Sequence, residues 1–255
     1  MILAIDMGNT NIVIGCIDNE KTYFVERMST DLSKTELEYA IGIKTVLELY
    51  HIQVKELEGV IISSVVPPLL NILRRACKKV LDIDAYVVGP GVKTGLNILM
   101  DNPAQVGSDM IVSAVAGLNE YGAPFIFIDM GTATTISVVD RAGNYVGGAI
   151  LPGIHTALNA LVSNTAQLPK ISMEAPKKVI GKNTIDCMKS GMIMGNASCI
   201  DGMIDRIIEE LGYEARILVT GGLAGVVVPY CKHSIIIDDA LLLKGLKIIY
   251  DKNKK

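Results

Sequence analysis

The chain has 255 residues, of which 50% are hydrophobic and 20% are charged, so it can form one or two folded domains and is not a largely disordered chain. Lysine and arginine together number 24 against 27 aspartate and glutamate residues, which gives a formal net charge of -3. This balance provides no electrostatic attraction to nucleic acid or to an anionic membrane, and we expect neither as a partner.

The N-terminus and the cysteines favour a soluble cytoplasmic protein. Asp6 interrupts the apolar start, and no basic segment or cleavage pattern accompanies it, so we expect no signal peptide. The longest apolar stretch, 59–73, contains Pro67, Pro68 and Asn71 and is therefore not a membrane span. The 5 cysteines are an odd number without a CxxC pair, which is typical of reduced thiols in the cytoplasm.

The first predicted element in chain order is a β-hairpin. An apolar run at 2–5 leads into a turn that carries Asp6, Gly8 and Thr10, and a β-rich run at 12–17 leaves that turn. Apolar residues three or four apart, and one short buried run, then predict three helices and one strand in this half of the chain. The helices are expected at 34–49, 68–81 and 103–118, and the strand at 60–64.

The second half of the chain repeats this pattern. The sequence IDMGTATTISVVD at 128–140 matches IDMGNTNIVIGCID at 5–18, and the strand-like run at 216–222 matches the one at 60–64. The repeat predicts two α/β lobes of common ancestry, 1–122 and 123–255. Helices are expected at 154–161, 184–211 and 239–250, and the last of these could pack on either lobe.

The repeated Asp-x-Gly turn has a chemical use. Glycine permits close backbone approach, the turn amides and a hydroxyl can surround phosphate oxygens, and the aspartate can hold a cation. One such turn is also an ordinary hairpin turn capped by its aspartate, and Gly221 with Gly222 could simply join a strand to a helix. Two copies together with this Gly-Gly turn favour a nucleotide-binding cleft between the two lobes.

Nine segments in order over nearly the whole chain carry a more specific resemblance. They are DMGNT at 6–10, SSVVPP at 63–68, GPGVKTGL at 89–96, DNPAQVGSD at 101–109, IDMGTATT at 128–135, GGAILPG at 147–153, TAQLP at 165–169, GKNT at 181–184 and TGGLA at 220–224. The chain is similar to the acetate and sugar kinase, heat-shock chaperone and actin superfamily, and within it resembles the type III pantothenate kinase family. The resemblance implies a duplicated ribonuclease-H-like, actin-like ATPase fold with the nucleotide in a cleft between two lobes. It also implies ATP-dependent phosphorylation of pantothenate to 4′-phosphopantothenate, the first step of coenzyme A biosynthesis.

The same resemblance implies roles for individual residues. Asp109 matches the family's general base, Asp129 matches the ligand of a monovalent cation (K⁺ or NH₄⁺), and Asp6 is a candidate Mg²⁺ ligand. A homodimer is also implied, because the acceptor pocket of the family is completed across a subunit interface. The positions that match ATP contacts are Asp6, Met7, Gly8, Asn9, Thr10, Asn11, Ile12, Val13 and Thr132. Those that match pantothenate contacts are Met100, Gly107, Ser108, Asp109, Met110 and Thr184.

Two positions depart from the family pattern. Met110 stands where an arginine is usual, and Met100 stands where an aromatic residue is usual. Methionine cannot pair with a carboxylate as arginine does, so a nucleotide-binding regulatory paralogue with lost or altered acceptor specificity stays open as an alternative. A sugar or acetate kinase of the same superfamily is a third reading. Taken alone, Asp109 could be an early-helix carboxylate and Thr184 the N-cap of the helix that follows.

Overall fold

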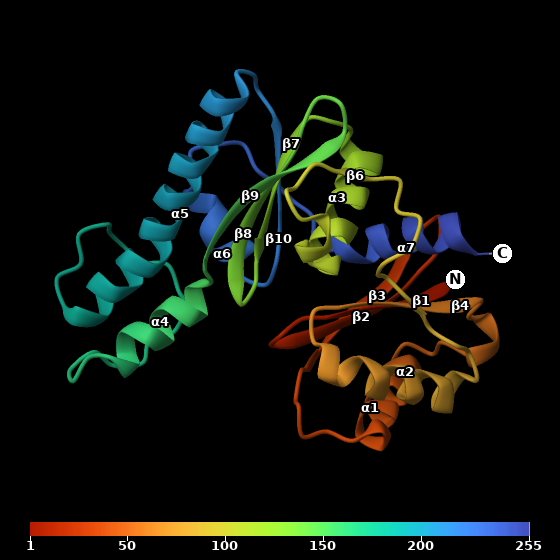
Figure 1. The fold of residues 1–255 in the computed structure, drawn as a ribbon. Coiled ribbons are helices and arrows are strands. Elements are labelled where there is room, and N and C mark those ends of the chain that lie inside the picture. The colour runs from red at the N-terminus through yellow and green to blue at the C-terminus, as the bar shows by residue number, and fades with distance from the viewer. Residues whose placement is uncertain (255) are drawn as a thin grey trace. The chain divides into compact units, whose positions relative to one another are not determined.

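The computed structural model describes residues 1–254, which form two compact units (Figure 1). The first unit contains Met1–Glu120 together with the C-terminal segment from Ala240 onward, and the second contains Tyr121–Asp239. The units differ from the expected lobes, 1–122 and 123–255, chiefly in the C-terminal segment. Helix α7 (Leu241–Asn253) packs on β1 (Ile2–Met7) and therefore belongs to the first unit.

The first unit is built on a mixed sheet of order β3-β2-β1-β4-β5. Strand β1 pairs antiparallel with β2 and parallel with β4, so Asp6 lies opposite Val13 on one side and Ser63 on the other. The further strands of this sheet are β2 (Asn11–Ile17), β3 (Thr22–Ser29), β4 (Gly59–Ser64) and β5 (Tyr86–Val87), and the short strand β6 (Asn97–Ile98) is not part of it.

Helices cover both faces of this sheet. Leu3, Ile5 and Met7 share one hydrophobic core with residues of α1 and α2, whereas Ile2 and Ala4 share another with α3 and α7. Because side chains alternate along a strand, Asp6 points to the same face as Ile2 and Ala4. The helices are α1 (Glu36–Leu49), α2 (Pro67–Leu81) and α3 (Ser108–Tyr121), with short 3₁₀ turns η1 (Val54–Glu56) and η2 (Pro103–Gln105).

Local sequence explains where these helices begin. Thr35 and Glu38 form a capping box before α1, and prolines occupy the first turn of α2, where an amide donor is not needed. The helix predicted over 103–118 is wrong at its start, because Pro103–Gln105 form only a 3₁₀ turn and α3 begins at Ser108. Val106, between the two, is extended. The predicted helix at 184–211 is confirmed in full as α5.

The second unit repeats the topology of the first. Its strands are ordered β11-β10-β7-β8-β9, with β7 antiparallel to β8 and parallel to β10, so that β7 takes the place of β1. Even the irregularity in the hairpin recurs, at Cys16/Ile17 in the first unit and at Val138/Val139 in the second. The predicted duplication is therefore confirmed. The strands are β7 (Phe125–Met130), β8 (Ala133–Val139), β9 (Asn144–Pro152), β10 (Arg216–Thr220) and β11 (Ile236–Ile237).

One long helix packs on the second sheet. Ile193, Ile200 and Ile204 of α5 are buried in one core with Ile126 and Ile128 of β7. Phe125, Phe127 and Asp129 therefore lie on the opposite face, by the alternation of the strand. The helices of this unit are α4 (Ile154–Ser163), α5 (Thr184–Leu211) and α6 (Ala224–Val227), with the 3₁₀ turn η3 (Val228–Tyr230).

Helix α7 is fixed to the first unit by apolar and polar contacts. Leu243, Leu246 and Ile249 are buried in the core that also contains Val112 of α3. Lys247 is only 5% exposed, and its Nζ donates to Asn19 Oδ1 at 2.7 Å and pairs with Asp251. The buried ammonium therefore has partners in both the β2–β3 turn and its own helix, as a buried charge requires.

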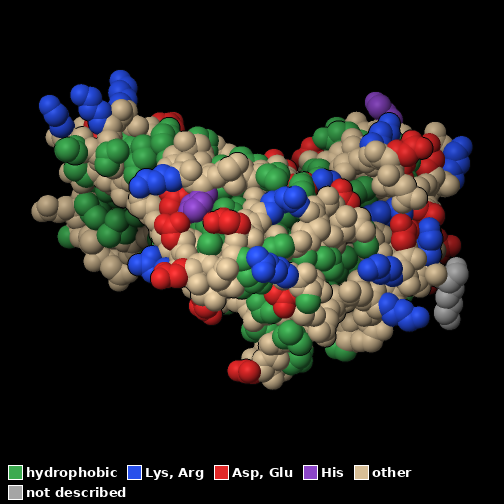
Figure 2. Space-filling model, turned by 90° about the horizontal axis from the view of Figure 1, so that it is seen from above, with side chains coloured by type: hydrophobic (Ala, Val, Ile, Leu, Met, Phe, Trp, Pro, Cys, Tyr) green, Lys and Arg blue, Asp and Glu red, His purple; other side chains and the backbone are tan. Residues whose placement is uncertain are grey.

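The surface carries charges of both signs. Figure 2 shows lysine and arginine side chains lying beside aspartate and glutamate over much of the displayed face, as the small net charge leads one to expect. Within residues 1–254, none of the helices combines the length and the apolar composition needed to cross a bilayer.

The crossing of α7 over α3 generates a stability prediction. A Cβ on Gly245 would overlap the carbonyl oxygen of Val112, which is backbone and cannot rotate away. We expect Gly245→Ala to lower the free energy of unfolding, because overpacking of about 1–3 kcal/mol exceeds the roughly 1 kcal/mol that alanine gains over glycine in a helix. Urea unfolding measures the change. The matched control is Gly191→Ala in α5, where a Cβ meets nothing within 4 Å and stability should rise; equal effects of the two substitutions would contradict the tight crossing.

Candidate functional site

The turn after β1 is held tightly by its own backbone and by β3. Gly8 N donates to Asn11 O at 3.0 Å, and Thr30 donates from Oγ1 to Gly8 O at 2.7 Å and from its amide to Thr10 O at 2.9 Å. Asn9, Thr10 and Asn11 are exposed, while Asp6 at the strand end is only 6% exposed. The turn thus presents a fixed set of polar groups to solvent beside a largely buried carboxylate.

Not all predicted nucleotide positions of this turn can act through their side chains. Met7 and Ile12 are fully buried in the core shared with α1 and α2, and Val13 is half-buried. For Met7 and Ile12, only the backbone could reach a ligand. The side chains that remain available are polar ones, which suits a phosphate site.

The turn after β7 is the counterpart in the second unit and is one residue shorter. Gly131 N donates to Ala133 O at 3.0 Å, and Thr132 O accepts from Gly153 N at 3.1 Å and from Thr156 Oγ1 at 2.7 Å. Thr132 itself is exposed. Both copies therefore form a short glycine turn whose carbonyl is fixed by a threonine hydroxyl from another element.

Asp129 lies among hydroxyl groups. It is opposite Thr135 on β8 and Thr220 on β10, and residues in register on neighbouring strands point to the same face. A half-buried carboxylate with hydroxyl oxygens nearby is a donor set for a hard cation. Among residues 1–254 there is no group of three or more His, Cys, Asp or Glu side chains that could hold a metal, so a divalent ion would also need ligand oxygens or water.

Asp109 stands in the first turn of α3, in a confined position. Its Oδ1 accepts from Met110 N at 2.9 Å, and a Cβ on Gly107 would overlap that same oxygen. A side chain at 107 would therefore require the carboxylate to move from this position. Burial raises the pKa of Asp109 above its ordinary value of 3.8, against the opposing effect of the hydrogen bond from Met110 N.

Hydrogen bonds join the start of α3 to β4. Ser63 Oγ lies 2.9 Å from Ser108 Oγ, which also accepts from Ser64 N at 3.2 Å and donates to Ser64 O at 3.1 Å. Since Ser63 is the register partner of Asp6, the structure brings the 107–110 segment and the end of β1 into one neighbourhood of the first unit.

The remaining acceptor positions have different surroundings. Met100 is 37% exposed, whereas Met110 is 8% exposed. Thr184 is the exposed first residue of α5, but the N-cap is Asn183, whose Oδ1 accepts from Asp186 N at 2.9 Å. The reading of Thr184 as that N-cap is therefore wrong, and its hydroxyl is not needed to start the helix.

Sequence reasoning assigned no role to several residues that shape these sites. Ser63 lies in a segment that carried the family resemblance, and a buried-type strand that ends in serine was the available signal. Thr220 likewise begins a resemblance segment, TGGLA at 220–224, whereas Thr30 and Thr156 lie in a strand connection and a helix, where a lone threonine gives no local signal. Their roles depend on pairings between distant segments.

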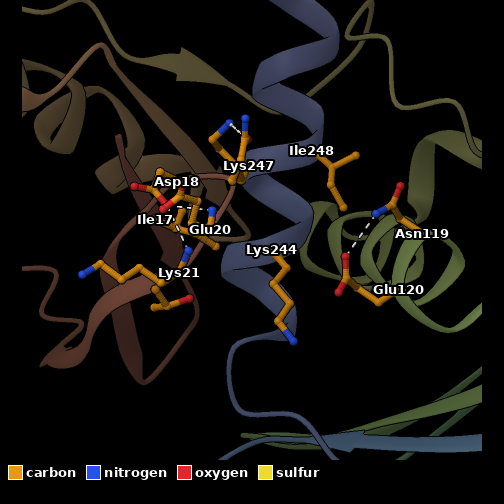
Figure 3. Close-up of a pocket in the computed structure, with 11 residues that line it drawn as sticks. Ile17, Asp18, Glu20, Lys21, Asn119, Glu120, Lys244, Lys247 and Ile248 are labelled. Carbon is orange, nitrogen blue, oxygen red and sulfur yellow. Dashed lines mark hydrogen bonds between the residues drawn. The ribbon is translucent and has the colours of Figure 1, made fainter.

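A separate pocket of about 410 Å³ lies in the first unit (Figure 3). Its lining comes from the β2–β3 hairpin, the end of α3, and α7, rather than from the predicted site residues. Lys21, Lys244 and Lys247 line it together with Asp18 and two glutamates, so its charges are mixed. Asp18 is engaged by the amides of Glu20 and Lys21 and by Tyr23, which holds the hairpin turn.

Comparison with solved structures identifies the fold. The (R)-2-hydroxyglutaryl-CoA dehydratase component A of Acidaminococcus fermentans aligns over 99% of each chain, with a TM-score of 0.57 and 14% identity. The inorganic polyphosphate/ATP-glucomannokinase of Arthrobacter sp. strain KM aligns over 98% of this chain and 97% of its own, with a TM-score of 0.50 and 13% identity. Together with the repeated sheet, these likenesses show a duplicated ribonuclease-H-like fold.

Sequence comparison narrows this fold to one family. The family model described as type III pantothenate kinase matches residues 2–206. Proteins named type III pantothenate kinase from Geobacillus sp. (strain WCH70) and Halalkalibacterium halodurans are each 43% identical over 253 residues, which cover 99% of this chain and 98% and 100% of theirs. The chain belongs to the type III pantothenate kinase family, and the resemblance seen in its motifs is confirmed.

The confined carboxylate predicts a pH-dependent stability. Because the folded pKa of Asp109 is raised, the folded protein binds this proton more tightly than the unfolded chain does, and the wild type loses stability as pH rises through that window. The side chain of Asp109→Asn does not titrate in this way. The free energy of unfolding of the variant relative to that of the wild type should therefore be higher at about pH 7 than at about pH 4. Urea unfolding at both values measures it. A variant that is less stable than wild type at pH 7 would contradict the burial of the charge.

Proposed function

We propose that this protein transfers the γ-phosphoryl group of ATP to the hydroxyl of pantothenate and so forms 4′-phosphopantothenate, the first step of coenzyme A biosynthesis. Family membership over nearly the full chain supports the reaction. The observation that supports its chemistry is the hydrogen bond from Ser63, the register partner of Asp6, to Ser108, the residue before Asp109.

The nucleotide is held by backbone and polar groups of the repeated turns. The 6–13 turn binds phosphate oxygens through its amides and the exposed side chains of Asn9, Thr10 and Asn11, and Thr132 supplies a further ATP contact. Fixed amides are suited to this task because they need no reorganisation when charge develops on the phosphoryl group.

Two cations complete this proposal. Asp6 would hold Mg²⁺ or its waters, and Asp129 with the nearby Thr135 and Thr220 would hold K⁺ or NH₄⁺. These oxygen donors fit hard cations, and the ions would supply positive charge against the phosphates. The protein's own part is to orient the carboxylates at the strand ends.

Asp109 acts as the general base. A hydroxyl is a poor nucleophile until its proton leaves, and a carboxylate within reach can accept that proton as the oxygen attacks phosphorus. Because burial raises the pKa of Asp109, its carboxylate is a better proton acceptor than that of an exposed aspartate. Gly107 has no Cβ and so leaves space for the carboxylate at its observed position.

The working form is proposed to be a cytoplasmic homodimer. Val179 and Ile180 are 66% and 81% exposed, and Ile185, beside Thr184, is 47% exposed. Apolar side chains gathered around an expected substrate position support burial there by a second subunit.

The alternative function is a nucleotide-binding regulator with lost or altered acceptor specificity. Met110 favours it, because a buried thioether provides no charge for the carboxylate of pantothenate. An assay of pantothenate turnover by the wild type separates the two functions. The kinase would phosphorylate pantothenate, whereas the regulator would bind ATP but leave pantothenate unphosphorylated.

The role of Asp109 is tested by Asp109→Asn in an assay of ADP release. We expect kcat to fall by about 10²–10⁴-fold, because the amide cannot accept the proton. ATP affinity, measured by calorimetry with Mg²⁺, should stay unchanged. The matched control is Asp84→Asn, whose side chain is 84% exposed and which should keep full activity. Wild-type turnover in Asp109→Asn would refute the base.

The departure at position 110 is tested by Met110→Arg. A guanidinium at this place can pair with the carboxylate of pantothenate, so we expect the KM for pantothenate to fall while the KM for ATP stays the same. The free energy of unfolding should also fall, because the charge enters a site that is now 8% exposed. An unchanged pantothenate KM would show that the acceptor does not bind next to residue 110.

A further inference from the structure

Ser63 occupies a buried position between two proposed parts of the reaction site. It is fully buried near the end of β4 and is the register partner of Asp6 on β1. Ile61, two residues earlier, belongs to the core that contains Val112 and Val115 of α3. By the alternation of the strand, Ser63 points to this same face, which α3 covers and to which Asp6 also points.

The hydroxyls of Ser63 and Ser108 form a saturated network. Ser63 Oγ donates to Ser108 Oγ at 2.9 Å, Ser64 N donates to the same oxygen at 3.2 Å, and Ser108 Oγ donates to Ser64 O at 3.1 Å. A hydroxyl has one proton and two lone pairs, so these contacts use the full capacity of Ser108 Oγ. Its hydroxyl therefore serves the protein rather than the acceptor molecule.

The network fixes the helix start that carries Asp109. Ser108 is the first residue of α3 and Asp109 the second, and the carboxylate is confined between Gly107 and the amide of Met110. Three hydrogen bonds to one side chain leave the first turn little freedom to rotate or slide along β4. A shift of about 1 Å in a reacting group is enough to slow a reaction by about 10²-fold.

We infer that Ser63 is a positioning residue for phosphoryl transfer: through Ser108 it holds the carboxylate of Asp109 in register with the Asp6 end of β1. Ser63 touches neither nucleotide nor acceptor in this role. The inference rests on the proposed function of Asp109 as the base, and it adds a residue that acts only through that base.

The test compares Ser63→Ala and Ser108→Ala with the wild type in the ADP-release assay. We expect kcat to fall about tenfold in each, with the KM for ATP and for pantothenate within about twofold of wild type, because the base is displaced while the ligand contacts remain. The double variant should lose no more than Ser108→Ala alone, because that substitution already removes the Ser63 contact together with both contacts to Ser64. Ser108→Thr keeps the hydroxyl and should restore kcat.

Ser113→Ala is the matched control. Ser113 is also fully buried and lies on the same helix, but its Oγ has no hydrogen-bond partner among residues 1–254. Its kcat should equal that of the wild type. Melting temperatures above the assay temperature establish that each variant is folded, and if Ser63→Ala does not fold, the pair Ser108→Ala and Ser108→Thr makes the same comparison at a partly exposed position.

A cycle with Asp109→Asn separates this inference from the proposed function. If Ser63 acts through the base, Ser63→Ala should cause no further loss of the residual rate in the Asp109→Asn background. A tenfold loss in that background, or a kcat within twofold of wild type in folded Ser63→Ala and Ser108→Ala, would overturn the inference and leave the base in place. Full activity of Asp109→Asn would instead overturn the base and the inference with it.

Discussion

The parallel pairing of β1 with β4 is the constraint on which the first unit depends. It sets Asp6 beside Ser63, and because register in a sheet changes by whole residues, a slip of either strand by one residue would send its own polar side chain into the apolar core of the other face. Leu3 and Ile5 on one face and Ile2 and Ala4 on the other hold this register, since each set fits a separate core. The geometry of the proposed site therefore depends on aliphatic packing some distance from it.

Much of this fold could be predicted because its signals are local. The two Asp-x-Gly turns, the apolar strands before them and the amphipathic run at 184–211 are each legible in a short window, and the repeat between halves links them. The start of α3 was not legible, because Pro103 and the residues after it carry helix signals that only a 3₁₀ turn uses. The placement of α7 also depends on tertiary packing against Val112, which periodicity does not report.

The candidate site also has features that sequence motifs reveal and features that only the folded structure reveals. Motif resemblance identified Asp109 and its neighbours, but it treated Ser108 as an acceptor contact, whereas its hydroxyl is engaged by Ser63 and the backbone of Ser64. Such a pairing spans 45 residues of sequence and has no pattern of its own. Burial is also invisible in a motif, so Met7 and Ile12 matched nucleotide positions although their side chains belong to the core.

The two units show how one duplicated framework can support different chemistry. Asp6 and Asp129 occupy equivalent strand ends, but their neighbours differ, with Val13 and Ser63 beside the first and Thr135 and Thr220 beside the second. Thr135 takes the place that Val13 has in the first unit, so Asp129 has one more hydroxyl oxygen beside it. Such an oxygen suits a cation site. In the first unit, Ser63 donates its hydrogen bond to Ser108, at the start of the helix that carries Asp109. A few side chains at matched positions would thus be enough to separate the proposed charge neutralisation from the proposed proton transfer, while the shared backbone keeps both glycine turns.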